Sequence, residues 1–400
     1  MTSDARPAVA ATGNSLWSAF LPLLPFMLTV FVGFVAMGMA LPVIPRHVHD
    51  TLGQGTVVVG FVMGIQYLSS LFGRMWAGGT TDERGPKIAA LIGLVAVCGV
   101  GALYLLSVPF VAGSPRAALA LVLCARLLTG IVESFVITST MAWGLMRVGP
   151  SHAGKVFGWM GVALFGGLAA GAPLGTAIYA RYDFAGVACA VLVAGAIALA
   201  FTSCIAAMRP SGLPRLPFTR VLGAVKLPGL GLTLCSAGYA MIIAFAVLLF
   251  GQRGWSGGAL ALTCMGLGFI VGRLVFGHLP DAVGGARVAL YCVLAEAIGL
   301  TLIWAAPVPA VAWLGAALGG GGYGLGFQGF GLEAVRRAPE QARGSAMGAY
   351  VIFQDLSMGL GPPLGGALAK VAGLDAVYLA AAVAALGSAA IAAHMLGRSD

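Results

Sequence analysis

Long apolar stretches, separated by short polar segments, recur along the chain from Phe20 almost to its C-terminus. Each stretch reaches about 20 residues, the length that an α-helix needs to cross roughly 30 Å of hydrocarbon. The pattern predicts an all-α membrane protein. Its twelve transmembrane helices are expected at residues 20–45, 56–79, 87–110, 117–146, 153–180, 184–208, 227–250, 257–279, 287–306, 309–335, 343–369 and 373–396.

The polar segment 208–228 differs from the other interruptions because it holds four basic residues and four prolines. Proline disfavours a continuous helix, and the charges forbid a membrane span. The segment therefore divides six predicted spans from six. The expected organisation is a disordered tail at 1–15, an N-terminal six-helix bundle at 16–208, a cytoplasmic linker at 209–226 and a C-terminal six-helix bundle at 227–397.

The two halves repeat the same pattern of glycine, arginine and aspartate. "AGAPLG" at 170–175 also matches "LGPPLG" at 360–365. Internal symmetry of this kind is expected of transporters built from repeated halves, with the solute site near the bilayer midplane between them. The matching pairs are Gly73 with Gly272, Arg74 with Arg273, Gly78 with Gly277, Asp82 with Asp281, and Gly85 with Gly284.

Composition and charge agree with this prediction. The chain is 60% hydrophobic and only 9% charged, whereas about a quarter of a soluble domain is charged. The net charge of +9 lies mainly on one side of the predicted membrane, since fourteen of the 22 lysines and arginines fall in one set of loops and five in the other. By the positive-inside rule both termini are cytoplasmic. The basic residues thus report topology, and no nucleic-acid partner is predicted.

No enzyme, cofactor or metal site is predicted. The seven cysteines all lie in apolar segments without a C-x-x-C pair, and only His47 and His49 lie close together among the histidines. The G-x-G-x-x-G match at 324–329 lies within a predicted span, without the strand that a dinucleotide site requires. The P-loop-like string at 149–156 has Val156 where Ser or Thr would bind magnesium.

A small charged turn joins the second and third predicted spans. Gly78 permits close approach of a neighbouring helix, and Gly85 permits a tight turn. Asp82 is expected to face the positive N-terminus of another helix, near 339–342, and Asp281 that near 150–151. Arg84 and Lys87 can pair with acids or lipid headgroups. The predicted cytoplasmic gate comprises Arg74, Gly78, Asp82, Arg84, Gly85, Lys87, Arg273, Gly277, Asp281 and Gly284.

Gly78-x-x-x-Asp82-x-Arg84-Gly85-x-Lys87 resembles the cytoplasmic loop signature of the major facilitator superfamily. The segment from "LPVIPRHVHDTLG" to "TTDERGPK" resembles the YhhS/YfcJ-type subgroup of bacterial transporters, usually described as sugar-efflux-like. The resemblance covers the whole chain. It implies a monomer in the bacterial inner membrane, with two pseudo-symmetric six-helix bundles that work by alternating access.

The proline strings of spans 5 and 11 are candidate kinks. Pro173 removes a helix hydrogen bond, while Gly171 and Gly175 permit tight packing beside it. Within the superfamily this string resembles a motif associated with antiporters, and an ordinary packing kink is the alternative. Pro362 and Pro363 stand at the matching place in span 11.

Ionisable residues inside the spans are candidates for proton coupling. Arg126 and Glu133 lie seven residues apart, so their positions share one face of a helix. Arg126 resembles the arginine of the superfamily's span 4 motif, which is linked to proton coupling, although purely structural pairing is the alternative. Asp355 is the second candidate, for substrate contact or a second proton. The predicted solute cavity adds Gln66, Tyr67, Tyr239, Tyr323, Gln328 and Gln354.

The absence of a nucleotide-binding motif leaves an ion gradient, most simply of protons, as the energy source. The first hypothesis is therefore proton-coupled efflux of a small organic solute. The second is proton-coupled uptake of a polar or anionic metabolite by symport. The third, from another class, is a non-transporting membrane sensor or assembly partner. The sequence leaves the identity of the solute open.

Overall fold

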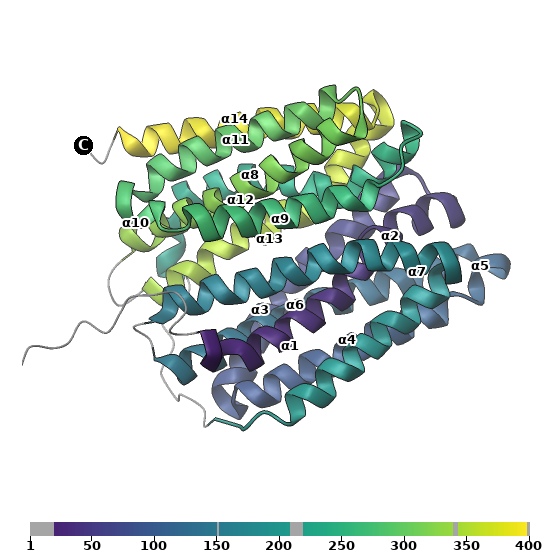
Figure 1. Ribbon diagram of the computed structural model, residues 1–400, viewed down its shortest axis with the longest axis horizontal. Helices are drawn as coiled ribbons and strands as arrows, with labels where there is room; N and C mark the ends of the chain where they lie inside the picture. Colours follow the sequence, from purple (N-terminus) through teal and green to yellow (C-terminus); the bar gives the residue numbers. More distant parts are fainter. Residues whose placement is uncertain (1–19, 150–151, 209–218, 339–342, 398–400) are drawn as a thin grey trace, which may run out of the picture.

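The computed structural model describes residues 20–149, 152–208, 219–338 and 343–397, and these form helices and no strand (Figure 1). The helices are α1 (Phe20–Ala40), α2 (Val43–Arg46), a π-helical turn (His47–Thr51), α3 (Thr56–Arg84), α4 (Pro86–Ser107), α5 (Phe110–Gly113), α6 (Pro115–Val148), α7 (Ala153–Ser203), α8 (Thr219–Gln252), α9 (Gly258–Phe276), α10 (Leu279–Val283), α11 (Gly285–Ala305), α12 (Pro309–Arg337), α13 (Arg343–Ala372) and α14 (Leu374–Leu396).

The long helices account for twelve spans, because α7 carries two of them. α7 is 51 residues long and breaks at Asp183, where φ is 53° and ψ is −160°. By length and hydropathy, nine helices of the described residues qualify as membrane spans, with α7 counted once. α12 and α13 are the long helices outside that group, and both are rich in glycine, whose hydropathy is close to zero. The prediction of a twelve-helix all-α protein is confirmed.

The spans form two bundles that meet along two seams. The helices from α1 to α7 pack against one another, as do those from α8 to α14. The bundles lie one above the other in Figure 1, purple to teal below and green to yellow above. α3 packs against α13 along one seam and α7 against α9 along the other. The centre of the molecule therefore lies between two pairs of helices from opposite halves.

The repeat is visible in the backbone of the two short turns. Gly85 has φ 90° and ψ 157°, and Gly284 has φ 93° and ψ 145°. Residues with a Cβ rarely adopt this region, so glycine is required at both places. Pro86 then starts α4 at a position where its missing N–H costs nothing. The predicted tight turn at Gly85 is confirmed.

The start of the second half differs from the sequence-based expectation. α8 begins at Thr219 and contains Pro228, so the last part of the predicted 209–226 linker is helical. A membrane helix tolerates proline because neighbouring groups satisfy the carbonyl that loses its partner. The other three prolines of this segment lie outside the described residues.

Candidate functional site

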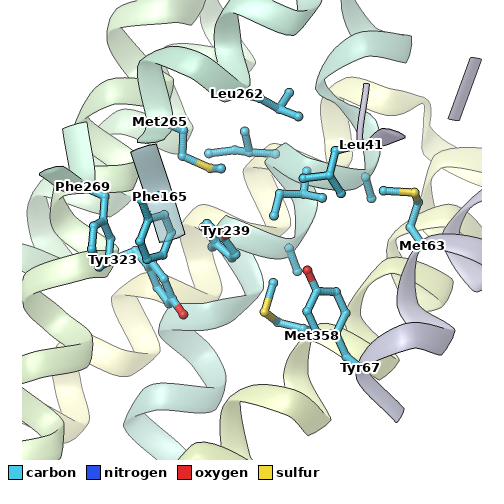
Figure 2. Close-up of a cluster of buried hydrophobic side chains, with 14 of the residues drawn as sticks. Leu41, Met63, Tyr67, Phe165, Tyr239, Leu262, Met265, Phe269, Tyr323 and Met358 are labelled. Carbon is cyan, nitrogen blue, oxygen red and sulfur yellow. The ribbon is translucent and has the colours of Figure 1, made fainter. Parts of the chain in front are cut away.

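Aromatic side chains from several helices close the centre of the molecule (Figure 2). Tyr239 of α8 stacks on Tyr323 of α12, with ring centroids 4.5 Å apart and planes at 15°. Phe165 of α7 stacks on Phe269 of α9 across the seam, with centroids 3.5 Å apart. Tyr67 of α3 is also buried here. The predicted cavity residues Tyr67, Tyr239 and Tyr323 thus come together, in a packed cluster that we call the aromatic centre.

An ion pair joins the halves at the other seam. Arg74 of α3 donates from Nε to Oδ2 of Asp355 in α13 at 2.5 Å, and from Nη2 to Oδ1 at 2.9 Å. The side chain of Arg74 is 23% exposed and that of Asp355 only 1%. Two parallel charge-assisted hydrogen bonds of this kind are strong and directional. The structure therefore connects a predicted gate residue directly to a predicted coupling residue.

Glu133 of α6 lies close to this pair. Its Oε2 accepts a long hydrogen bond of 3.5 Å from Nε2 of Gln66. Its carboxylate interacts electrostatically with Arg74, Asp355 and Arg126. The attraction between Glu133 and Arg74 is stronger than that between Glu133 and Arg126. Glu133 and Asp355, which come from opposite halves, therefore share Arg74 as a positive neighbour.

Arg126 does not form an ion pair with Glu133 among the described contacts. It is 1% exposed and donates from Nε to the carbonyl of Val62 at 3.2 Å and from Nη2 to that of Met63 at 3.3 Å. Positions seven apart share a helix face, yet a long side chain can turn toward the neighbouring helix. Arg126 thus ties α6 to the backbone of α3.

The three predicted glutamines lie in different surroundings. Gln66 is buried, and its Oε1 has no hydrogen-bond partner. Gln328 donates from Nε2 to the carbonyl of Gly277, which ends α9, at 3.1 Å. Gln354 reaches Sδ of Met358 at 3.7 Å. Among these three glutamines, Gln66 therefore joins the charged cluster through its hydrogen bond to Glu133, while Gln328 holds the end of a helix.

The gate residues are only partly described. Lys87 donates from Nζ to the carbonyl of Ser203 at 2.7 Å and so holds the end of span 6; its pairing with an acid or a lipid headgroup stays a prediction. The guanidinium of Arg273 lies beside Gly158 of α7. The places where Asp82 and Asp281 were expected to bind, 339–342 and 150–151, lie outside the described residues, as does the side chain of Asp281.

The two proline strings sit against different helices. A Cβ on Gly171 would lie 2.5 Å from the carbonyl oxygen of Val35 in α1, and one on Gly175 would lie 2.0 Å from that of Met39. Pro173 thus belongs to a tight α1–α7 contact within one half. The Pro362–Pro363 string instead faces the seam, since a Cβ on Gly60 of α3 would lie 2.1 Å from the carbonyl oxygen of Pro362.

A cavity of about 680 Å³ lies at one end of the molecule. Arg46, Asp50, Tyr179 and Trp255 contribute to its lining, and Arg46 and Asp50 are exposed to solvent. This is the end marked by α2 and α5 in Figure 1, opposite α10 and the Gly85 and Gly284 turns. We call it the vestibule. Tyr239 of the aromatic centre lies deeper along α8 than Val247 and Phe250, which line the vestibule.

Sequence reasoning missed two buried aromatic residues of the aromatic centre. Phe165 and Phe269 carry no polar atom, so a search for polar residues in spans passes over them. Glu296 of α11 is fully buried and accepts a hydrogen bond from Sγ of Cys235 at 3.0 Å. The sequence alone already places this acid inside a predicted span. Within the described ranges, no three His, Cys, Asp or Glu side chains gather as metal ligands would.

Comparison with known proteins identifies relatives over the full length. The family model described as "Major Facilitator Superfamily" matches residues 26–259 and 228–400. An uncharacterised MFS-type transporter of Pseudomonas aeruginosa is 39% identical over 100% of this chain and 99% of its own. The structure resembles the nucleoside transporter NupG, with a TM-score of 0.70, 14% identity and coverage of 94% and 99%. It also resembles the human organic anion transporter MFSD10, with a TM-score of 0.68, 16% identity and coverage of 92% and 98%.

Proposed function

The chain belongs to the major facilitator superfamily, and from this premise we propose that it is a proton-coupled secondary transporter that exports a small organic solute. As a multi-pass MFS-type transporter it has a solute as its partner. We place it in the bacterial inner membrane as a monomer with both termini in the cytoplasm. The export direction rests on the sequence resemblance to efflux-type transporters.

The observation that carries proton coupling is the charge cluster at the α3–α13 seam. Arg74 and Asp355 come from opposite halves, and alternating access requires such seams to open and close. Glu133 interacts with both members of the pair. Separation of the halves changes the hydration of Glu133 and its distance from Asp355 of the other half, and both control the balance between its charged and neutral forms. Glu133 can thus load a proton on one side and release it on the other.

The experiment uses purified protein in proteoliposomes, with a solute found by a ligand-stabilisation screen. Glu133→Gln keeps size and hydrogen bonding but cannot titrate. It should abolish accumulation driven by a pH gradient and spare solute exchange when the pH is equal on both sides. Glu83→Gln, at an exposed carboxylate next to the C-terminal residue of α3, is the matched control and should accumulate solute normally. Accumulation by Glu133→Gln at the wild-type rate would refute coupling through Glu133.

The second candidate is uptake of an anionic solute together with a proton. The observation in its favour is the unequal exposure of the ion pair at the α3–α13 seam. The side chain of Arg74 is 23% exposed to solvent, whereas that of Asp355 is 1% exposed. An anion entering the centre would meet Arg74 before Asp355. Efflux by exchange and uptake by symport predict opposite pH changes in the liposome lumen when solute moves inward, so a pH dye inside the vesicles separates them.

A non-transporting sensor or assembly partner is the remaining alternative. It predicts solute binding without counterflow.

For the transporter, we propose that Asp82 and Asp281 latch the cytoplasmic side against the starts of α13 and α7. Gly78, Arg84 and Gly277 belong to the same proposed latch. A carboxylate at a helix N-terminus gains roughly 0.3–2 kcal/mol, enough to bias two conformations of similar energy.

A further inference from the structure

The pair between Arg74 and Asp355 is unequal in its access to solvent. Asp355 is almost completely enclosed, whereas nearly a quarter of the Arg74 side chain is exposed. The two partners also sit on helices of opposite halves, α3 and α13. Any separation along this seam therefore stretches the pair, and the arginine is the member that a ligand entering the centre reaches first.

A guanidinium released from Asp355 needs a replacement acceptor. Arginine stays charged under all ordinary conditions, and its planar fork matches a carboxylate that accepts two hydrogen bonds side by side. Arg126, the other buried arginine of this half, already donates to the carbonyls of Val62 and Met63. Arg74 is thus the cation that an incoming carboxylate can bind by replacing Asp355.

The surroundings of Arg74 favour an aromatic body on the same ligand. Tyr323 lies near Arg74 and stacks on Tyr239. Tyr67 of α3 lies near Asp355. Flat aromatic surfaces beside a single charged group are typical of sites for small organic molecules, because they bind a ring by stacking while the charge fixes its orientation.

We propose that the substrate is a small aromatic carboxylate, which binds Arg74 in place of Asp355 while Asp355 takes up a proton. The inference rests on the second candidate function, symport of an anionic solute with a proton, and specifies its substrate class. One carboxylate replaces another on Arg74, and the proton neutralises the one displaced, so the charge of the site is unchanged. Binding an anion together with a proton favours symport over exchange.

The proton is needed because the displaced Asp355 would otherwise stay buried without a partner, which is strongly unfavourable. Arg74 of α3 pairs with Asp355, and Tyr67 of α3 and Glu133 of α6 lie near it. The next groups out are Arg126 near Glu133, Tyr323 of α12 near Arg74, and Tyr239 of α8 near Tyr67. α14 turns its Tyr378 hydroxyl to the carbonyl of Met241. Glu133 keeps its hydrogen bond from Gln66, so Asp355 is the acid that loses its partner.

The test measures binding to purified protein without any gradient. The probes are benzoate, the neutral benzamide of nearly the same shape, and the cationic benzylamine. Benzoate should raise the unfolding temperature in a saturable manner, and the other two probes should not. Arg116→Gln, which removes an exposed positive charge at the start of α6, is the matched control and should bind benzoate as the wild type does.

Two variants assign the binding to the pair. Asp355→Asn removes the internal competitor for Arg74, so benzoate should bind about tenfold more tightly, as expected when a competing state is removed. Arg74→Gln combined with Asp355→Asn removes both charges, leaves no buried ion unpaired, and should abolish benzoate binding. In weakly buffered solution, wild-type protein should take up roughly one proton per benzoate, and Asp355→Asn none.

The inference is overturned if the double variant binds benzoate, if benzylamine binds and depends on Asp355, or if no benzoate binding is detected. These results are separable from failure of the proposed function. If the protein transports a neutral solute with protons but does not bind benzoate, the transport function stands and the aromatic carboxylate substrate is refuted. A protein that binds benzoate in the stated pattern but shows no counterflow refutes transport and keeps the site.

Discussion

Arg74 and Arg126 differ in function because their guanidinium groups face different acceptors. Arg126 donates to two backbone carbonyls of α3 and is 1% exposed, so it fixes α3 beside α6. Arg74 faces carboxylates from both halves. An ion pair between side chains can break and form again when helices move. Hydrogen bonds from a side chain to the backbone of a neighbouring helix hold that helix in place. We therefore propose that Arg126 supports Glu133 by position and that Arg74 takes part in coupling.

Asp183 provides a test at the level of a single residue. It is an exposed residue with φ 53° and ψ −160° between spans 5 and 6, a region that is populated almost only by glycine. Asp183→Gly should raise the stability of the purified protein by about 1 kcal/mol, because relief of strain exceeds the added entropy of the unfolded chain. Thermal unfolding measures this. Asp183→Ala is the control, and an equal gain there would contradict the strain argument.

At the level of helices, glycine lets backbones touch in two distinct ways. Gly171 and Gly175 bring α7 against α1 inside one half, and Gly60 and Gly64 bring α3 against α13 across the seam. Small residues at helix contacts are the usual means of association in lipid, where apolar burial gives little net drive. The first contact belongs to the folding of a bundle. The second is one that the proposed alternating access must break and remake.

Alanine substitutions should separate these two kinds of contact. Gly60→Ala places a Cβ against the carbonyl of Pro362, which prevents α3 from closing on α13, so transport should fall about tenfold or more while each half stays folded. Gly175→Ala should instead lower the unfolding temperature, because the clash lies inside one bundle. Gly79→Ala, on the same helix with nothing within 4 Å, is the control. Wild-type transport by Gly60→Ala would show that the seam need not close so tightly.

For the whole molecule, the structure places a vestibule at one end and the aromatic centre beyond it. The Gly85 and Gly284 turns lie at the opposite end. In the proposed orientation the vestibule faces the outside of the cell, and the protein is open there and closed at its centre. The orientation of the protein in the membrane therefore decides from which side of the membrane the solute enters the vestibule.

Reporter fusions test that orientation. The segment 208–228 carries four basic residues, which favour retention in the cytoplasm, so a reporter inserted after Gly212 should give a cytoplasmic signal. A reporter inserted after Gly113, exposed between α5 and α6, is the matched control and should give a periplasmic signal. The opposite pair of signals would invert the proposed topology and place the vestibule on the inner side.

The sequence alone determined the twelve spans, the two halves and the glycine turns. These features depend on local signals. About 20 apolar residues specify a span. Glycine at 85 and 284 permits the positive φ that the two turns adopt. The repeat of Arg74 and Asp82 at Arg273 and Asp281 gave the symmetry directly. The resemblance to the YhhS/YfcJ-type subgroup stays a prediction beyond the superfamily itself.

Only the tertiary structure decided which polar groups meet. Arg74 and Asp355 lie 281 positions apart, and no spacing rule relates residues of different halves. Helical spacing placed Arg126 and Glu133 on one face, yet packing against α3 offered Arg126 the carbonyls of Val62 and Met63 instead. The pairing partner of a buried charge depends on which acceptor the neighbouring helix presents, and that is set by helix packing and not by the chain's local pattern.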